Sequence, residues 1–322
     1  MSNKSLGDFI VDRTESLNDK SIQDYYIDTQ HSHIDRLLDS EQYILEGSRG
    51  IGKTMLLRSA EIRATEEFGK ESILAVWVNF EESLRIARIR IIDDSIDPFL
   101  QWTMGKILHE TLKKIISLKP SCEDQLRCHL SSIFNGSTDE DYIDSFNTYV
   151  DLLDEYIKIL EKGDIEDNSM LSNHSPSNKL SSILDNPVSF KAFMLQLIKD
   201  FKLERIVLFF DEAAHVFSHE QQEKFFTLFK ALRNPQIACK AAVYPGITNY
   251  GKYFEKGQDA KELRIDWSSK NKDDISYIRS ILKKRILAYD NNDTSILQDL
   301  TRKKNNCRRR YGLRVLCDYF IS

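Results

Sequence analysis

The sequence has few cysteines and lacks a long hydrophobic run. It contains five cysteines in 322 residues. Their number is odd and no two form a Cys-x-x-Cys pair, so neither a disulfide framework nor a zinc ribbon is expected. Free thiols are typical of a reducing compartment, and we predict a cytoplasmic location. No apolar stretch reaches the roughly 18 residues that a membrane-spanning helix needs, and the polar first residues do not resemble a signal peptide.

An excess of positive charge is also lacking. The formal net charge is -5, which excludes a uniformly basic coat for nucleic acid but leaves room for a local basic patch. Hydrophobic residues make up 41% of the chain, an ordinary value for a globular protein. The length suits one large domain with a small one, or two modest domains.

A glycine-rich motif at residues 47–54 carries the most specific signal. It follows the pattern Gly-x-x-x-x-Gly-Lys-Thr, after a short apolar stretch and before a helical run. In such a phosphate-binding P-loop the glycines let successive N–H groups face one concavity, at the positive end of the following helix. Lys53 would lie near the β- and γ-phosphates, and Thr54 would offer its hydroxyl to Mg²⁺. The predicted ATP-binding residues are Gly47, Ser48, Arg49, Gly50, Ile51, Gly52, Lys53 and Thr54.

A second apolar stretch, at 204–212, ends in two acids. As a buried strand it would deliver Asp211 to the carboxyl edge of a parallel sheet, where the P-loop also opens. We predict that Asp211 holds Mg²⁺ and that Glu212 orients and deprotonates the attacking water. A strand ending in Asp-Glu also arises by chance, but together with a P-loop it indicates ATP hydrolysis.

Other apolar patterns predict the rest of the fold. Strands are expected at 73–80, 238–244 and 263–267, the last near the sheet edge. Helices are expected at 31–39, 98–116, 142–162, 188–201, 221–232, 272–289, 293–303 and 312–320.

These patterns predict an α/β protein with a parallel-sheet P-loop core over residues 31–270. Residues 1–30 would form an N-terminal arm, and residues 271–322 a small all-α lid. The polar composition of 120–185 indicates a helical and loop insertion, in which we expect 163–179 to be mobile.

With both motifs in place, the chain resembles the AAA+ ATPases, and among them the origin-recognition-complex-like branch. The resemblance covers about residues 31–322 outside the insertion. It rests on GSRGIGKT, IVLFFDEA, AAVYPGITN and a late YGLR. It implies a polar sensor after the fourth strand, where Thr248 or Asn249 stands, with Asn249 positioning the water. It also implies a nucleotide-sensing arginine in the lid, where Arg314 stands; a plain surface charge is the alternative for Arg314.

The sequence departs from that family in two places. Between Asn249 and Leu263 it has lysines but no arginine, so the arginine finger that the resemblance implies for this stretch is missing. Origin-recognition initiators also carry a winged-helix DNA-binding domain after the lid. The residues up to Ser322 leave no room for one, and we do not expect autonomous sequence-specific DNA binding.

A dense basic cluster lies in the predicted lid. It could contact nucleic-acid phosphates, an acidic protein partner or the solvent, and the sequence leaves all three open. Its members are Arg302, Lys303, Lys304, Arg308, Arg309 and Arg310.

We predict an ATPase that uses ATP and Mg²⁺, turns over slowly, and acts as a switch or assembly module with a protein partner or as a homo-oligomer. The main alternative is a regulatory subunit that holds ATP or ADP without hydrolysis. For stand-alone bacterial ATPases of this kind the resemblance implies an effector partner, including in antiviral defence. A DNA-associated ATPase and a small-molecule kinase are weaker alternatives.

Overall fold

The computed structural model describes Thr14 and residues 17–27, 33–80, 97–119, 142–162, 182–266 and 272–289. The chain divides into two compact units. The larger unit contains Asp35–Arg49 and Ala60–Arg264. The smaller unit contains Gly50–Ser59 and the described residues before Asp35 and after Arg264.

The larger unit is built on a five-stranded sheet with the order β2-β3-β4-β1-β5. All neighbouring strands in it run parallel. This confirms the predicted α/β class with a P-loop type of core. The strands are β1 (Tyr43–Glu46), β2 (Ile73–Asn79), β3 (Arg205–Asp211), β4 (Ile237–Val243) and β5 (Lys261–Arg264).

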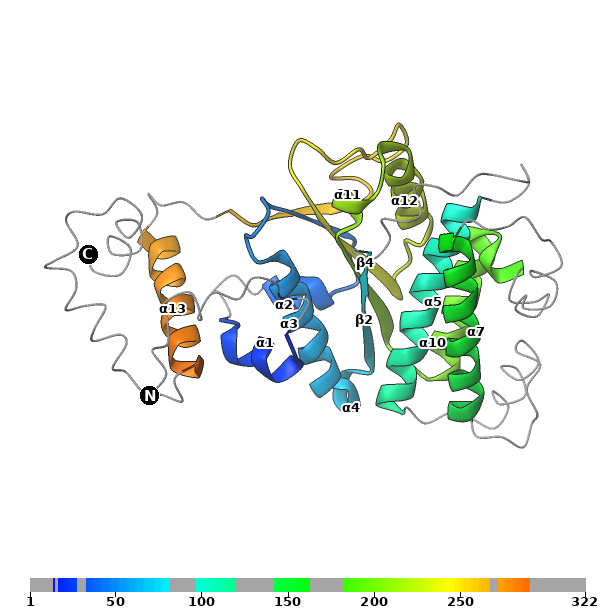
Figure 1. The fold of residues 1–322 in the computed structure, drawn as a ribbon, viewed down its shortest axis with the longest axis horizontal. Coiled ribbons are helices and arrows are strands. Elements are labelled where there is room, and N and C mark those ends of the chain that lie inside the picture. Colours follow the sequence, from blue (N-terminus) through cyan, green and yellow to red (C-terminus); the bar gives the residue numbers. More distant parts are fainter. Residues whose placement is uncertain are drawn as a thin grey trace, which may run out of the picture. The chain divides into compact units, whose positions relative to one another are not determined.

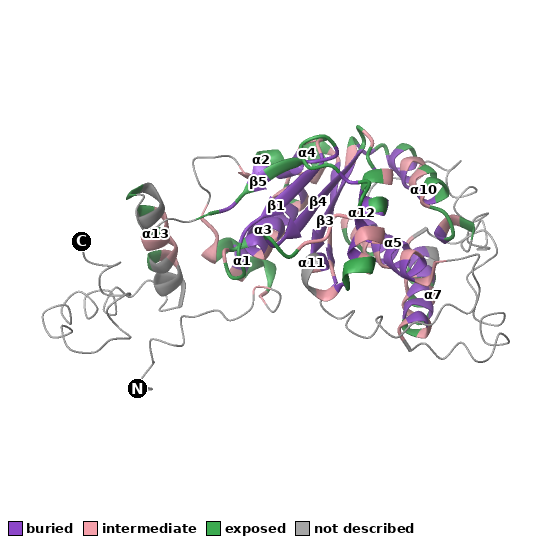
Figure 2. Cartoon of the chain, turned by 90° about the horizontal axis from the view of Figure 1, so that it is seen from above, coloured by how far each residue is buried: buried purple, intermediate pink, exposed green. Residues whose placement is uncertain are grey.

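Burial explains why the central strands read as continuous apolar runs. β1 and β4 are buried at every position, and β3 at every position after Arg205. Strands covered on both faces need no polar alternation. By contrast, β5 at the sheet edge buries only Leu263 (Figure 2). This weak pattern explains why β5 begins two residues before the predicted stretch.

Five helices of the larger unit follow predicted segments closely, whereas the short helices α4 and α11 were not predicted. α5 starts where Asp97 accepts hydrogen bonds from the N–H groups of Phe99 and Leu100, with Pro98 in the first turn, as the sequence predicts. α7 has the predicted bounds and packs against α5, which also contacts β2 (Figure 1). The helices that lie wholly or mostly in this unit are α2 (His33–Leu38), α4 (Phe68–Glu71), α5 (Pro98–Leu118), α7 (Tyr142–Lys162), α10 (Pro187–Asp200), α11 (Ala213–Val216) and α12 (His219–Ala231).

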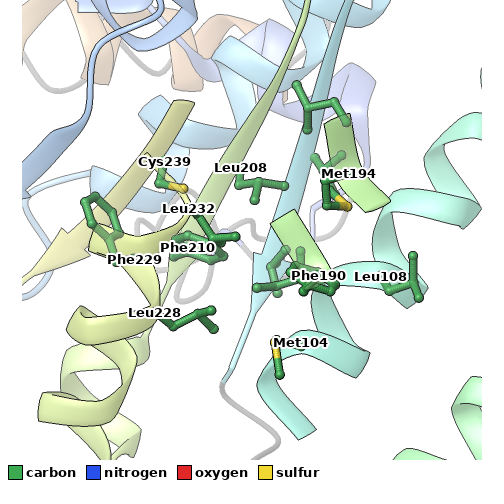
Figure 3. Close-up of a cluster of buried hydrophobic side chains, with 14 of the residues drawn as sticks. Met104, Leu108, Phe190, Met194, Leu208, Phe210, Leu228, Phe229, Leu232 and Cys239 are labelled. Carbon is green, nitrogen blue, oxygen red and sulfur yellow. The ribbon is translucent and has the colours of Figure 1, made fainter. Parts of the chain in front are cut away.

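One face of the sheet packs on a continuous apolar core. Alternate residues of β3, Leu208 and Phe210, belong to it, as does Cys239 of β4. Side chains from α5, α10 and α12 meet them (Figure 3). The ring centroid of Phe80, just after β2, lies 5.0 Å from the ring centroid of Phe217 and 5.7 Å from that of Trp102. This packing gives the ends of β2 and β3 a rigid support.

The smaller unit contains α1 (Asp19–Tyr25) and α13 (Lys272–Tyr289), which pack together. Lys284 Nζ donates to the carbonyl of Gln23 at 2.9 Å, and Tyr277 Oη donates to the carbonyl of Ile27 at 2.9 Å. α1 lies within the segment expected to be an N-terminal arm, and α13 matches a predicted helix. The predicted helices at 293–303 and 312–320 lie outside the described residues, as do 120–141 and 163–181 of the predicted insertion. The division into arm, core, insertion and lid stays a prediction.

Helix α3 (Lys53–Glu66) follows the P-loop directly. Its first residues belong to the smaller unit and its last residues to the larger one. In the larger unit Glu61 pairs with Lys114 of α5 at 2.8 Å, and Arg63 pairs with Asp35 at 2.6 Å.

Candidate nucleotide site

The carboxyl ends of the parallel strands form one edge of the larger unit. Asp211 at the end of β3 lies beside Asn79 at the end of β2. Glu46 at the end of β1 lies beside Val243 at the end of β4. Gly47 donates its N–H to the carbonyl of Val243 at 3.4 Å, so the P-loop leaves the sheet at this edge. Gly47 to Arg49 therefore start at the edge where Asp211 and Glu212 lie, as parallel topology predicts.

The rest of the loop adopts a conformation that favours glycine. Gly50 has a φ of +80° and Gly52 a φ of +100°, and a Cβ on either would meet no atom within 4 Å. Backbone conformation, rather than lack of space, therefore accounts for both glycines. The N–H of Leu56 donates to the Gly52 carbonyl at 3.0 Å, and α3 begins at Lys53. A helix start after such a turn is a ready anion site.

Asp211 is held at the end of β3. Asp211 is buried, with 1% of its surface exposed to solvent. Trp77 of β2 donates from Nε1 to Asp211 Oδ2 at 3.4 Å, and the N–H of Glu212 donates to Oδ1 at 3.1 Å. These donors fix the orientation of a buried carboxylate at the edge where the P-loop begins.

Glu212 has a left-handed backbone, with a φ of 61°, and precedes α11. Tyr244 Oη donates to Glu212 Oε1 at 3.0 Å. Burial raises the pKa of Tyr244 above its usual range, and the negative charge of Glu212 and their hydrogen bond raise it further. The positive charge of Arg49 lowers this pKa in part. Tyr244 is thus a protonated donor at neutral pH.

Tyr244 and Trp77 are contacts of the acid pair that the sequence analysis missed. Tyr244 is the first residue after β4, and Trp77 lies in β2. Their contacts depend on β3 lying between β2 and β4. The sequence signal was the position of Tyr244 at the end of a predicted strand, where parallel topology gathers side chains; Trp77 lies inside its predicted strand and carried no such signal.

Thr248 and Asn249 hold the segment after β4. Thr248 Oγ1 donates to the Tyr244 carbonyl at 2.9 Å and accepts from the Tyr244 N–H at 3.2 Å. Asn249 Nδ2 donates to the carbonyl of His219 at 2.9 Å, and its N–H donates to Gln222 Oε1 at 2.7 Å. These contacts tie the segment to itself and to α12. The sensor role of Asn249 stays a prediction.

Glu46, the residue before the P-loop, is buried and ion-paired with two cations. Lys256 Nζ lies 3.3 Å from its carboxylate, and Arg264 Nε lies 3.4 Å from it. Arg264 is the last residue of β5. The pairs therefore tie the start of the P-loop to the edge strand and to the segment before it. Sequence reasoning did not identify this cluster.

Each unit, taken by itself, carries residue types that suit a magnesium–triphosphate complex. Gly50 and Gly52 have the backbone of a phosphate-binding turn, and Lys53 opens the helix that follows. Asp211 supplies a carboxylate and Thr54 a hydroxyl, and oxygen ligands are those that Mg²⁺ prefers. Arg314 and the basic cluster at 302–310 lie outside the described residues.

A family model described as ORC-CDC6-like matches residues 9–312. The chain belongs to the ORC-CDC6-like family. Membership confirms the predicted resemblance and implies nucleotide binding of the AAA+ ATPase type. Searches of curated proteins and of solved structures found no match. In the part of this ORC-CDC6-like chain that the structure describes, no helix is both long and apolar enough to cross a membrane.

Proposed function

We propose that the chain binds ATP with Mg²⁺ and hydrolyses it slowly, as a cytoplasmic switch or assembly module. One observation carries this proposal. Gly47 to Arg49 leave the sheet at the edge where Asp211 ends β3 and Glu212 follows it. The start of a P-loop and an acid pair at one sheet edge are the two features from which a hydrolytic site is built.

In this proposal each residue of the site has a separate role. Lys53 and the loop N–H groups bind the β- and γ-phosphates. Thr54 and Asp211 hold Mg²⁺, which when bound offsets charge on the two phosphates. Glu212 takes a proton from water, the water oxygen bonds to the γ-phosphorus, and the bond from that phosphorus to ADP breaks. Asn249 is proposed to position this water, and Arg314 to contact the nucleotide from the lid.

Slow turnover follows from the residues between Asn249 and Leu263. That stretch contains no arginine, and arginine is the side chain that best stabilises charge on a transferring phosphoryl group. Arg264, the next arginine along the chain, pairs with Glu46. Faster hydrolysis would need a cation from a partner protein or from another copy of this chain.

Phosphate release and ATP binding by purified protein test the proposal. Lys53→Ala should abolish ATP binding. Glu212→Gln should keep it and lower phosphate release by about 10²- to 10⁴-fold, the usual contribution of a general base. Glu220→Gln is the matched control, because Glu220 is exposed on α12 and pairs with Lys224 one helical turn away. Equal phosphate release by wild type and Glu212→Gln would overturn the enzyme proposal.

A nucleotide-holding regulatory subunit is the second candidate. It is favoured by the same lack of arginine, and it fits an effector partner in antiviral defence or a DNA-associated complex. The mass of the native assembly, measured with and without ATP and Mg²⁺, separates the candidates when combined with the nucleotide content. Intact ATP retained by an assembly that Glu212→Gln leaves unchanged would favour the regulatory role. Normal assembly of Lys53→Ala would exclude it.

A further inference from the structure

Tyr244 has a fixed backbone at the centre of the carboxyl edge. It follows β4, the strand that separates β3 from β1 in the sheet. Thr248 Oγ1 accepts a hydrogen bond from the N–H of Tyr244 and donates one to the Tyr244 carbonyl. Pro245 follows Tyr244 directly, which restricts the backbone of Tyr244 further. Tyr244 also belongs to the apolar core and is 8% exposed. Its hydroxyl therefore extends from a rigid base.

That hydroxyl meets one oxygen of the proposed catalytic base. Tyr244 Oη donates to Oε1 of Glu212 at 3.0 Å. An ionised carboxylate accepts through both of its oxygens, so a bond at Oε1 orients the group while Oε2 can accept a proton from water. Glu212 needs such an anchor, because a left-handed backbone at a residue other than glycine persists only where its surroundings hold it.

We propose that Tyr244 is a positioning residue that fixes the Glu212 carboxylate for proton transfer from water and so sets the kcat of ATP hydrolysis. The inference rests on the proposed function, since it needs Glu212 to act as the base. Burial and the charge of Glu212 keep the Tyr244 hydroxyl protonated, which a permanent donor requires. Asp211 adds to this effect and Arg49 opposes it.

The test is Tyr244→Phe, which removes the hydroxyl and keeps the ring that packs in the core. Loss of a hydrogen bond to a charged group should lower kcat by about 10- to 100-fold. The KM for ATP and the dissociation constant of ATP should stay within about twofold, because the hydroxyl acts on the base and not on binding. Tyr253→Phe is the matched control: Tyr253 lies in the same segment and is 73% exposed, and its variant should keep the wild-type kcat.

A double mutant separates positioning from general damage. If Tyr244 acts through Glu212, then adding Tyr244→Phe to Glu212→Gln should cost no further activity. An equal loss in both backgrounds, an unchanged kcat in Tyr244→Phe, or a change confined to KM would each overturn the inference while leaving the ATPase proposal intact. Wild-type protein with no phosphate release above Glu212→Gln would instead overturn the proposed function, and this inference with it.

Discussion

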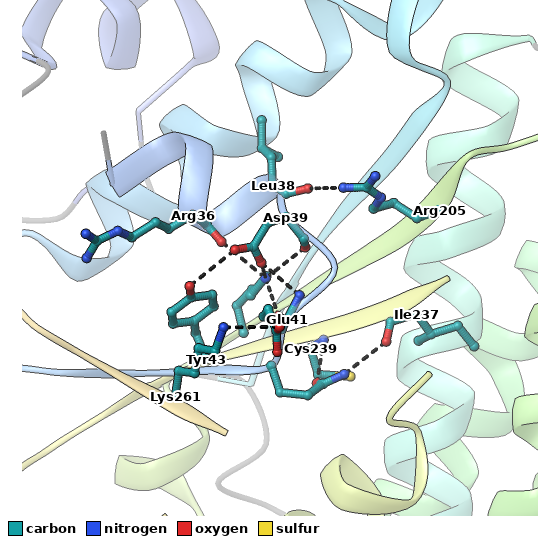
Figure 4. A network of polar contacts seen from close by, with 11 residues as sticks. Arg36, Leu38, Asp39, Glu41, Tyr43, Arg205, Ile237, Cys239 and Lys261 are labelled. Carbon is teal, nitrogen blue, oxygen red and sulfur yellow. Dashed lines mark hydrogen bonds and ion pairs between the residues drawn. The ribbon is translucent and has the colours of Figure 1, made fainter. Parts of the chain in front are cut away.

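The two edges of the sheet, at the amino and carboxyl ends of its strands, hold charged side chains differently around Lys240 and around the acids Asp211 and Glu212. At the amino edge, Lys240 of β4 is fully buried. Its ammonium bonds to Asp39 Oδ1 at 2.9 Å, to the Asp39 carbonyl at 3.0 Å and to the Arg36 carbonyl at 3.3 Å, and it also contacts the Glu41 carbonyl (Figure 4). At the carboxyl edge, neutral donors contact two acids: Trp77 donates to Asp211 and Tyr244 donates to Glu212. A third acid at this edge, Glu46, is instead paired with Lys256 and Arg264.

This difference distinguishes contacts that stabilise the fold from contacts that we propose to serve catalysis. The ammonium of Lys240 is satisfied by the protein itself, and its bonds tie the connection before β1 to β4. Gln42 reinforces the same joint by bonding the Ile237 carbonyl and the Cys239 N–H. The neutral donors Trp77 and Tyr244 orient the carboxylates of Asp211 and Glu212 without adding a positive charge through these contacts. Substitutions around Lys240 should therefore change stability, and those around Asp211 and Glu212 should change activity.

Lys240→Met should give the largest change in stability. Without the ammonium, three backbone carbonyls and the Asp39 carboxylate lose a donor, which should lower the free energy of unfolding by about 2–3 kcal/mol. Urea unfolding measures the loss, and kcat per folded molecule should stay unchanged. Lys70→Met, at an exposed lysine of α4, should stay within about 0.5 kcal/mol of wild type. A collapse of kcat at full folding would show that the two edges are not separate.

The lowered pKa of Lys240 leads us to expect that stability depends on pH. Burial lowers the pKa of Lys240 from 10.5 to about 8, although Asp39 offsets part of this shift. Between about pH 8 and pH 10.5 the unfolded chain binds more protons than the folded one. The contribution of Lys240 to the free energy of unfolding therefore rises with pH, and it is lost as pH falls through about 8. The unfolding free energy of wild type relative to Lys240→Met should grow by on the order of 1–3 kcal/mol between pH 7 and pH 10. A constant difference over that range would contradict the prediction.

The sequence predicted the features that depend on local patterns. The P-loop, the acid pair, α5 and α7 each follow from a motif or a periodic apolar pattern in one continuous segment. Lys240 and Tyr244 act across strands, and their contacts depend on β4 lying between β3 and β1. No local pattern specifies that order. Thr248 and Asn249 show the same limit, because their hydrogen bonds depend on how the segment after β4 folds against α12.

Gly52→Ala should have a smaller effect on stability and a clear effect on ATP binding. A Cβ there meets no atom within 4 Å, but the φ of +100° disfavours any side chain, which should cost about 1–2 kcal/mol. Relief of this strain would turn the N–H groups of the loop, so ATP affinity should fall in a binding titration. Gly69→Ala is the control, because Gly69 lies in α4 with open space around it and alanine favours a helix by up to about 1 kcal/mol. Equal ATP affinity for both variants would argue against a phosphate-binding turn.

Trp77→Phe should have the smallest effect, confined to the carboxyl edge. It removes the donor to Asp211 Oδ2, and at 3.4 Å that bond is long, so its loss should cost less than about 1 kcal/mol. If Asp211 holds Mg²⁺, the Mg²⁺ concentration that gives half-maximal phosphate release should rise by about two- to fivefold. Trp102→Phe is the contrasting control, because Trp102 is buried in the core and donates to Glu161 at 3.1 Å. The Trp102→Phe substitution should lower the free energy of unfolding and leave the Mg²⁺ requirement unchanged. If both variants shifted the Mg²⁺ requirement equally, Trp77 would act through packing, and the neutral donors at this edge would not be orienting the acids.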